Sequence, residues 1–197
     1  MDLKTVALVI VDISGYTRFI QFHKTSLLHA QEIISQLLEC VIDKASNPLT
    51  LNKLEGDAAF LYAELGDEQV NTIRDVVGQV KEFFVAFHAK TYELSGSRAN
   101  CPCEACQRIR DLRLKAILHQ GEVGFRKIRQ FDEMTGECVI LAHRLLKSSI
   151  TAHEYILMTE QFYRLAGELP GMGGEIHEEI YDDLGPVKVK VSYPAKG

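Results

Sequence analysis

The sequence lacks the features that mark several classes of protein. It has no apolar run as long as the roughly 20 residues that a membrane-spanning helix needs. It has no long basic run, and its net charge is −5, so non-specific binding to nucleic acid or to an anionic membrane is not expected. The N-terminus shows no charged region followed by a long apolar core, so no signal peptide is predicted and we expect a cytoplasmic protein.

Cysteine is scarce, and its distribution argues against a secreted disulfide scaffold. The five cysteines are an odd number, and three of them are crowded into Cys101-Pro-Cys103-Glu-Ala-Cys106. This spacing is typical of metal ligands, but a structural zinc site needs a fourth ligand. The candidates, all distant in sequence, are Cys138, Cys40, His88 and His119. Zn²⁺ binding that fastens the segment, a purely structural role and a redox pair all remain open.

The composition is typical of a globular domain, because 46% of the 197 residues are hydrophobic and 25% are charged. The periodicity predicts helices over 17–45, 67–94, 136–149 and 160–166. It predicts strands over 3–11, 49–55, 58–64, 112–119, 122–130, 154–158 and 186–193. Two pairs of strands read as hairpins, around Glu55-Gly56-Asp57 and around Gln120-Gly121. We therefore expect one α+β domain over 1–197, with a mixed or antiparallel sheet covered by helices and a cysteine-rich insert at about 95–110.

Two aspartates stand at expected strand ends beside glycines. Asp12 follows an apolar strand in VDISGYT, and Asp57 follows Gly56 in EGDAAF. If the first strand pairs with the hairpin, both carboxylates reach one edge of the sheet and, with the Ile13 carbonyl, form a suitable Mg²⁺ site. Two such ions suit phosphoryl or nucleotidyl transfer. The plainer alternative is that Asp12 caps a helix and Asp57 occupies a tight turn.

A third acid and a basic helix face accompany this pair. Glu55, in the same hairpin turn, is expected to be a solvated residue rather than a further metal ligand. Arg144 and Lys147 lie three residues apart and share a face of the predicted helix. From the residues alone that face reads as solvated, and His143 and His119 give no decisive signal.

Three motifs in the same order resemble the catalytic domain of class III nucleotidyl cyclases. They are VDISGYT, KLEGDAAF and the block from Leu112 to Leu146, and together they span residues from about 3 to 193. The chain is most similar to a bacterial, cyclase-related group of unestablished function that also carries the cysteine insert and the His-Arg-Leu-Leu-Lys segment. The resemblance implies a ferredoxin-like, class III cyclase-type fold.

The resemblance also implies residue roles. Asp12 and Asp57, with the carbonyl of Ile13, would hold two Mg²⁺ or Mn²⁺ ions. The remaining residues would contact the nucleoside triphosphate: Gly15, Tyr16 and Thr17 the phosphates, Lys53 and Asp132 or Glu133 the base, and Arg144 the phosphate that is transferred. The site would lie between the two subunits of a homodimer.

The expected activity is conversion of a nucleoside triphosphate, ATP being favoured, to a 3′,5′-cyclic nucleotide (cAMP from ATP) and pyrophosphate by two-metal catalysis. One departure from the family pattern stands out, because Ile140 occupies the place of an asparagine that orients the ribose. No clear lysine for the triphosphate precedes the last strand. The alternative is therefore a catalytically degenerate relative that binds nucleotide or forms dimers. A zinc-dependent scaffold or redox sensor is a third alternative.

Overall fold

The computed structural model describes residues 2–16, 19, 24–169 and 171–194. Strand β1 (Asp2–Ser14) lies in the middle of the sheet, between β3 (Ala58–Glu64) and β4 (Arg113–Ile128). The sheet continues outward through β2 (Thr50–Glu55) on one side and through β6 (Tyr155–Thr159), β8 (Gly185–Tyr193) and β7 (Gly173–Tyr181) on the other. The β4–β6 pair is parallel and the other pairs are antiparallel, so the expected mixed α+β sheet is confirmed.

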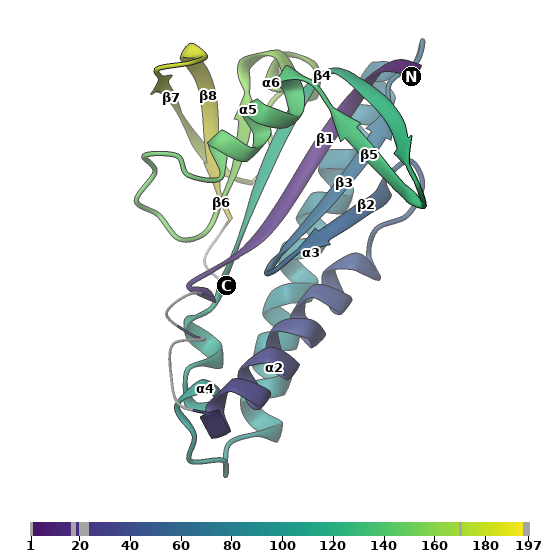
Figure 1. The fold of residues 1–197 in the computed structure, drawn as a ribbon. Coiled ribbons are helices and arrows are strands. Elements are labelled where there is room, and N and C mark those ends of the chain that lie inside the picture. The colour runs from purple at the N-terminus through teal and green to yellow at the C-terminus, as the bar shows by residue number, and fades with distance from the viewer. Residues whose placement is uncertain (1, 17–18, 20–23, 170, 195–197) are drawn as a thin grey trace.

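Helices cover both faces of this sheet (Figure 1). On one face, α2 (Lys24–Ile42), α3 (Gln69–Ser97) and α6 (Glu160–Ala166) pack over the side chains of Ala7, Val9 and Val11. On the other face, α5 (Glu137–Leu145) packs over Val6, Leu8 and Ile10. Because side chains alternate along a strand, β1 supplies both cores, which explains why its apolar run is continuous. None of the described helices is both long and apolar enough to cross a bilayer.

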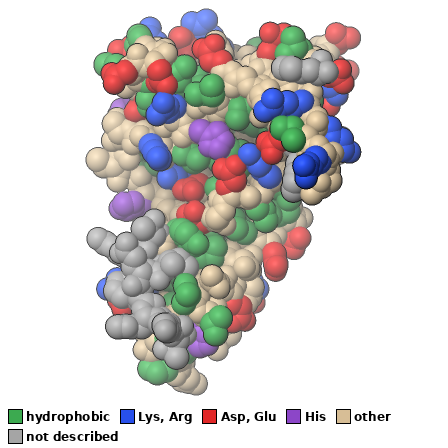
Figure 2. All heavy atoms as spheres, viewed as in Figure 1, with side chains coloured by type: hydrophobic (Ala, Val, Ile, Leu, Met, Phe, Trp, Pro, Cys, Tyr) green, Lys and Arg blue, Asp and Glu red, His purple; other side chains and the backbone are tan. Residues whose placement is uncertain are grey.

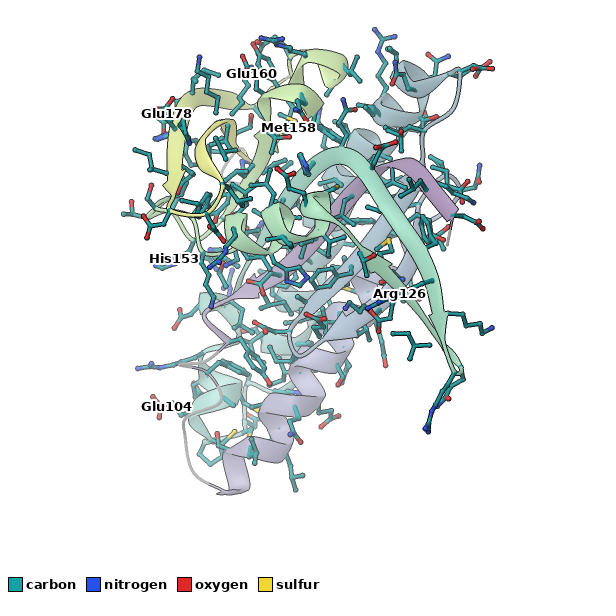
Figure 3. All side chains as sticks on the ribbon, turned by 45° about the horizontal axis from the view of Figure 1, so that its top comes forward. Glu104, Arg126, His153, Met158, Glu160 and Glu178 are labelled. Carbon is teal, nitrogen blue, oxygen red and sulfur yellow. The ribbon has the colours of Figure 1, made fainter. Side chains whose placement is uncertain are left out.

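The second expected hairpin is wrong, because Gln120 and Gly121 do not form a turn. They lie inside the single strand β4, where Gly121 pairs with Val6 of β1. A Cβ at Gly121 would come within 3.1 Å of the Cβ of Cys138 on α5, so the glycine permits close helix–strand packing. The actual partner of the far end of β4 is β5 (Phe131–Thr135), and the two form an arm that extends beyond the sheet, where Figure 3 labels Arg126.

Two further segments differ from the sequence-based expectation. Helix α3 continues to Ser97, and the insert after it contains the short helices α4 (Glu104–Gln107) and η1 (Ile109–Asp111). Figure 1 places α4 beside the start of α2. Strand β7 was not expected, because its side chains are mostly exposed and polar and it lies at the sheet edge, where no buried face produces an apolar pattern.

Candidate functional site

Asp12 lies near the end of β1, on the face of the sheet that α5 covers. Its Oδ2 lies 2.9 Å from the Nζ of Lys115, its cross-strand partner on β4, and both side chains are less than a fifth exposed. The same ammonium donates to the Leu146 carbonyl, 3.1 Å away, just beyond α5. Asp12 is therefore held within the sheet by an ion pair, and the described contacts of its side chain do not include the helix cap that was the alternative to a metal site.

Asp57 lies in the β2–β3 turn, which Gly56 makes possible with a φ of +62°. Its carbonyl accepts a hydrogen bond of 3.2 Å from the Ile13 amide, and Asp12 pairs with the adjacent Ala58. Burial, and then the negative charge of Asp12, raise the pKa of Asp57 to about 6, against the opposing effect of Lys115. The two carboxylates therefore share one site and repel each other across the turn.

The segment after β1 turns sharply at Gly15, where φ is +93°. The Gly15 carbonyl accepts a hydrogen bond of 3.0 Å from the Phe19 amide, as at the start of a helix. Tyr16 is partly buried and packs against the core on the α2 and α3 face. Thr17, the third expected phosphate contact, lies outside the described residues.

Lys53 and Glu133, both expected near the base, come together from different strands. The Lys53 Nζ lies 2.8 Å from a Glu55 oxygen, 3.8 Å from a Glu133 oxygen and 5.5 Å from the centre of the Phe60 ring. The β4–β5 arm thus reaches back toward β2. The backbone of Asp132 pairs with Lys127 in that arm, and its side chain lies outside the described part of the chain. Glu55 is exposed and paired with Lys53, in keeping with a solvated turn residue.

Helix α5 supplies the remaining expected residue. Arg144 is half exposed, and its guanidinium lies 2.7 Å from a carboxylate oxygen of Asp183. The neighbouring His143 stacks against Phe60 with ring centres 4.6 Å apart, and burial lowers its pKa. Ile140, one turn before Arg144, is 51% exposed, so its side chain lies at the surface of α5 on the same side as Arg144.

Figure 2 shows acidic and basic side chains lying close together over the sheet, on the side viewed in Figure 1. The described charges of the site follow the same pattern, since Asp12, Lys53 and Arg144 each have an oppositely charged neighbour. The described part of this site therefore consists of paired charges and is not a strongly basic surface.

The cysteine insert forms a second cluster. The sulfurs of Cys101, Cys103 and Cys106 surround the Nδ1 of His29, on α2, at 3.5, 3.4 and 3.5 Å. The four candidate partners proposed from the sequence are wrong, because each lies elsewhere. Cys40 contacts the Leu37 carbonyl, Cys138 lies beside Gly121, His88 pairs with Glu154 and His119 bonds to Thr159.

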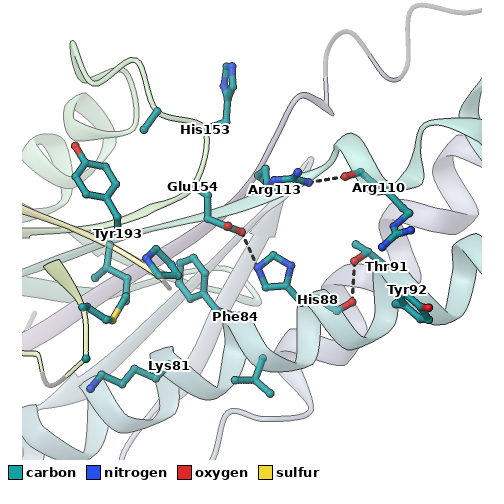
Figure 4. Close-up of a pocket in the computed structure, with 16 residues that line it drawn as sticks. Lys81, Phe84, His88, Thr91, Tyr92, Arg110, Arg113, His153, Glu154 and Tyr193 are labelled. Carbon is teal, nitrogen blue, oxygen red and sulfur yellow. Dashed lines mark hydrogen bonds and ion pairs between the residues drawn. The ribbon is translucent and has the colours of Figure 1, made fainter. Parts of the chain in front are cut away.

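A large open groove of about 1210 Å³ lies between α3 and the segments around β6 and β8 (Figure 4). The His88 and Glu154 side chains form an ion pair of 2.9 Å in it, beside Phe84 and Tyr193. Ile156, which also lines the groove, belongs to the core on the α2 and α3 face. Apart from His88, which the sequence analysis named as a candidate zinc ligand, none of the site residues expected from the sequence is among its described lining residues.

Sequence reasoning missed two residues of these clusters, Lys115 and His29. The signal for Lys115 was its register opposite Asp12, which becomes visible only when β4 is recognised as one long strand. His29 precedes the cysteines by 72 residues or more, so no local spacing connects them. The buried His119 is a core residue: burial lowers its pKa to about 4, and its ring bonds to Thr159 at 2.8 Å.

Comparison with known sequences identifies relatives of unknown activity. The family model described as "Protein of unknown function (DUF2652)" matches residues 34–155, more than half of the chain. The "Uncharacterized protein Rv2561/Rv2562" of Mycobacterium tuberculosis is 36% identical over 127 residues, which cover 64% of this chain and 57% of that protein. The aligned part of the chain thus spans little more than half the length of this curated relative.

Solved structures with the same architecture are nucleotide cyclase domains. The adenylyl cyclase CyaB from P. aeruginosa has a TM-score of 0.73 and 17% identity, with 99% of this chain and 96% of that chain covered. The guanylate cyclase domain of RhGC from Catenaria anguillulae, in complex with GTP, has a TM-score of 0.64 and 12% identity, with 100% of both chains covered. The chain therefore has the fold of the class III cyclase catalytic domains, and it belongs to the family described as "Protein of unknown function (DUF2652)".

Proposed function

We propose that the protein is a nucleotidyl cyclase that converts a nucleoside triphosphate, with ATP favoured, to a 3′,5′-cyclic nucleotide and pyrophosphate. The observation that carries this proposal is that Asp12 and Asp57 lie at the same edge of the sheet, where β1 ends and β3 begins. There the Ile13 amide donates a hydrogen bond of 3.2 Å to the Asp57 carbonyl. The edge lies directly before the turn at Gly15, whose missing side chain leaves the backbone open to a phosphate.

The donor set fits divalent cations. Two carboxylates face a single described lysine, Lys115, so the pair has one negative charge more than that lysine offsets; burial, and then the charge of Asp12, raise the pKa of Asp57. Asp12, Asp57 and the Ile13 carbonyl would hold two Mg²⁺ or Mn²⁺ ions, and all three are the oxygen ligands that these ions prefer. When bound, such ions supply a lowered pKa for the ribose 3′-hydroxyl and neutralisation of the triphosphate.

Lys53 and the acids of β5 would read the base. An ammonium only donates hydrogen bonds and a carboxylate only accepts them. The Lys53 and Glu133 side chains lie 3.8 Å apart, so they present one donor and one acceptor side by side. The adenine edge offers the complementary pair, N1 as acceptor and the N6 amino group as donor. Asp132, adjacent in the same strand, is the alternative acceptor.

Arg144 would stabilise the negative charge that develops on the transferred phosphate. Its ion pair with Asp183 has both side chains about half exposed, so breaking it costs roughly 1 kcal/mol or less. Because Arg144 is about half exposed on α5, we propose that it contacts a nucleotide held by a second subunit. We therefore place the active sites between the two chains of a homodimer, which would have two equivalent sites.

A second candidate function is a nucleotide-binding or dimerisation module without catalysis. The observation that favours it is Ile140, whose exposed side chain has no group that could hydrogen-bond a ribose hydroxyl. Loss of that contact would leave the metal and phosphate contacts in place while the attacking 3′-hydroxyl is poorly oriented.

The two candidates are separated by incubating the purified protein with ATP, GTP, CTP or UTP and Mg²⁺ or Mn²⁺, and measuring cyclic nucleotides by mass spectrometry. We expect cyclic product from the wild type, and a loss of at least about 100-fold in Asp12→Asn and Asp57→Asn. Glu64→Gln, which removes an exposed acid paired with Lys4, is the matched control and should retain activity.

Calorimetry with a non-hydrolysable triphosphate completes the test. Metal-dependent nucleotide binding that disappears in both aspartate variants, without any product from the wild type, would support the non-catalytic module. No product, together with nucleotide binding that neither substitution changes, would overturn the cyclase proposal and the assignment of this metal site.

A further inference from the structure

The geometry around His29 is that of a coordination polyhedron and not of a hydrogen-bonded cluster. A single ring nitrogen takes part in one ordinary hydrogen bond, yet three sulfurs lie at 3.4 to 3.5 Å from the same Nδ1. All four atoms lie within 4.8 Å of one another. Zinc bound tetrahedrally, with Zn–S near 2.3 Å and Zn–N near 2.05 Å, separates sulfur and nitrogen ligands by about 3.6 Å.

We infer that Cys101, Cys103, Cys106 and the Nδ1 of His29 form a closed, tetrahedral zinc site. Three thiolates and one imidazole are a ligand set that structural zinc sites use, and soft sulfur ligands select zinc over Mg²⁺ or Mn²⁺. All three cysteines are free thiols, so none is withdrawn from coordination by a disulfide. Four protein ligands leave no open position for a substrate or a reacting water, so the ion has a structural role.

The surroundings of the cluster suit a bound zinc. Three thiolates and one Zn²⁺ carry a net charge of −1, and the Arg98 guanidinium interacts with the Cys106 sulfur while it pairs with Glu32 at 2.7 Å. The Cys106 amide points at the Cys103 sulfur at 3.5 Å. Such outer contacts orient the ligands and offset the charge of the site.

The site would join two parts of the chain that are distant in sequence. Cys103 is the N-cap residue of α4 and Cys106 lies within that helix, whereas His29 lies in the second turn of α2. A hydrogen bond also joins α4 to α2, because the Ala105 amide donates to the Ser26 hydroxyl at 3.3 Å. Zinc would thus fasten the insert to the start of α2, whether or not the protein is a cyclase.

The test is metal analysis of the untagged full-length chain, purified under reducing conditions from zinc-supplemented medium. We expect about one zinc per chain, and replacement by Co²⁺ should give the thiolate-to-cobalt and tetrahedral d–d absorption bands of a sulfur-rich site. Cys103→Ser and His29→Gln should lower the zinc content at least about tenfold after dialysis against a mild chelator. Cys40→Ser and His88→Gln remove the same residue types elsewhere and should retain the metal.

A readout on the wild type covers the case in which a ligand variant does not fold. Modification of the thiols in the zinc-loaded wild type, followed with a colorimetric zinc indicator, should release the ion as the clustered cysteines react. Wild-type protein without zinc, a Co²⁺ spectrum without thiolate bands, or equal metal loss in the control variants would overturn the inference. Each of these outcomes is independent of cyclase activity.

Discussion

At the scale of single residues, the ionised carboxylate of Asp57 destabilises the native state of the metal-free protein. Its carboxyl is partly buried and faces the Asp12 carboxylate, and together these raise its pKa from 3.8 to about 6. Between about pH 4 and pH 6 the native state therefore binds more protons at this position than the unfolded chain does. Stability contributed by the protonated group is present below pH 4 and is lost as the pH rises through 6.

Replacing this carboxyl with an amide should stabilise the metal-free protein near neutral pH. We expect Asp57→Asn in EDTA at pH 7.5 to increase the free energy of unfolding by about 1 kcal/mol, a figure already reduced for the partial exposure of the side chain. Near pH 4 the difference should vanish. Urea unfolding of both proteins at the two pH values measures it.

Divalent metal and nucleotide should make the wild type more stable than Asp57→Asn, because they stabilise only a protein that binds them. The wild type should gain stability on addition of Mg²⁺ and a non-hydrolysable triphosphate, and Asp57→Asn should gain little. An Asn variant less stable than the wild type at pH 7.5 in EDTA would contradict the charge repulsion inferred between Asp57 and Asp12.

At the scale of elements, α5 places Ile140 and Arg144 one turn apart, so their side chains project from the same side of the helix. In the proposed site this face meets the ribose and the transferred phosphate. An amide at position 140 could hydrogen-bond a ribose hydroxyl, which the isoleucine side chain cannot do. Because Ile140 is exposed, its replacement removes little buried surface.

We therefore expect Ile140→Asn to raise cyclase turnover by about tenfold, the value of one added hydrogen bond of roughly 1.4 kcal/mol in the transition state. The measurement is the initial rate of cyclic nucleotide formation at saturating substrate and metal. Ile140→Ala shortens the side chain without adding a polar group and should leave the rate nearly unchanged. Equal rates for all three proteins would show that position 140 does not contact the ribose.

Elements also show where sequence reasoning succeeded and where it failed. The β2–β3 hairpin followed from Gly56, whose positive φ a tight turn requires, and from the apolar run of β3 that follows it. The same logic failed at Gly121, which is present for the close approach of Cys138 and not for a turn. A glycine at a turn and a glycine under a helix look alike in a sequence, because only the tertiary contact distinguishes them.

The candidate sites show the same difference between residues fixed by local sequence and residues fixed by tertiary contacts. Asp12 and Asp57 could be paired from sequence because each lies near a glycine at a strand end and because the motifs around them resemble those of class III cyclases. Lys115 and His29 could not, because a strand register determines the first and helix–insert packing determines the second. Local sequence thus located the carboxylates, and long-range packing supplied their lysine and the fourth ligand of the cysteine cluster.

At the scale of the whole molecule, the proposed dimer divides each active site between two chains. In the proposed dimer, Asp12 and Asp57 of one subunit would hold the metals, and Arg144 of the other would reach the phosphate. Two variants that each lose a different half of the site are then both inactive as homodimers. A mixed dimer of the two recovers one complete site, while its second site carries both defects.

Co-expression of Asp57→Asn with Arg144→Ala should therefore restore about a quarter of wild-type activity, because random pairing makes half of the dimers mixed and each has one intact site of two. Different affinity tags on the two chains allow the mixed dimer to be isolated, and its rate of cyclic nucleotide formation should be about half that of the wild type, because one of its two sites is intact. Co-expression of Asp57→Asn with Asp12→Asn is the matched control. Both substitutions then fall on the metal half, so every site in the mixed dimer lacks one ligand and no activity should return. Equal failure of both pairs, with mixed dimers isolated and the wild type active, would place the whole site within one chain.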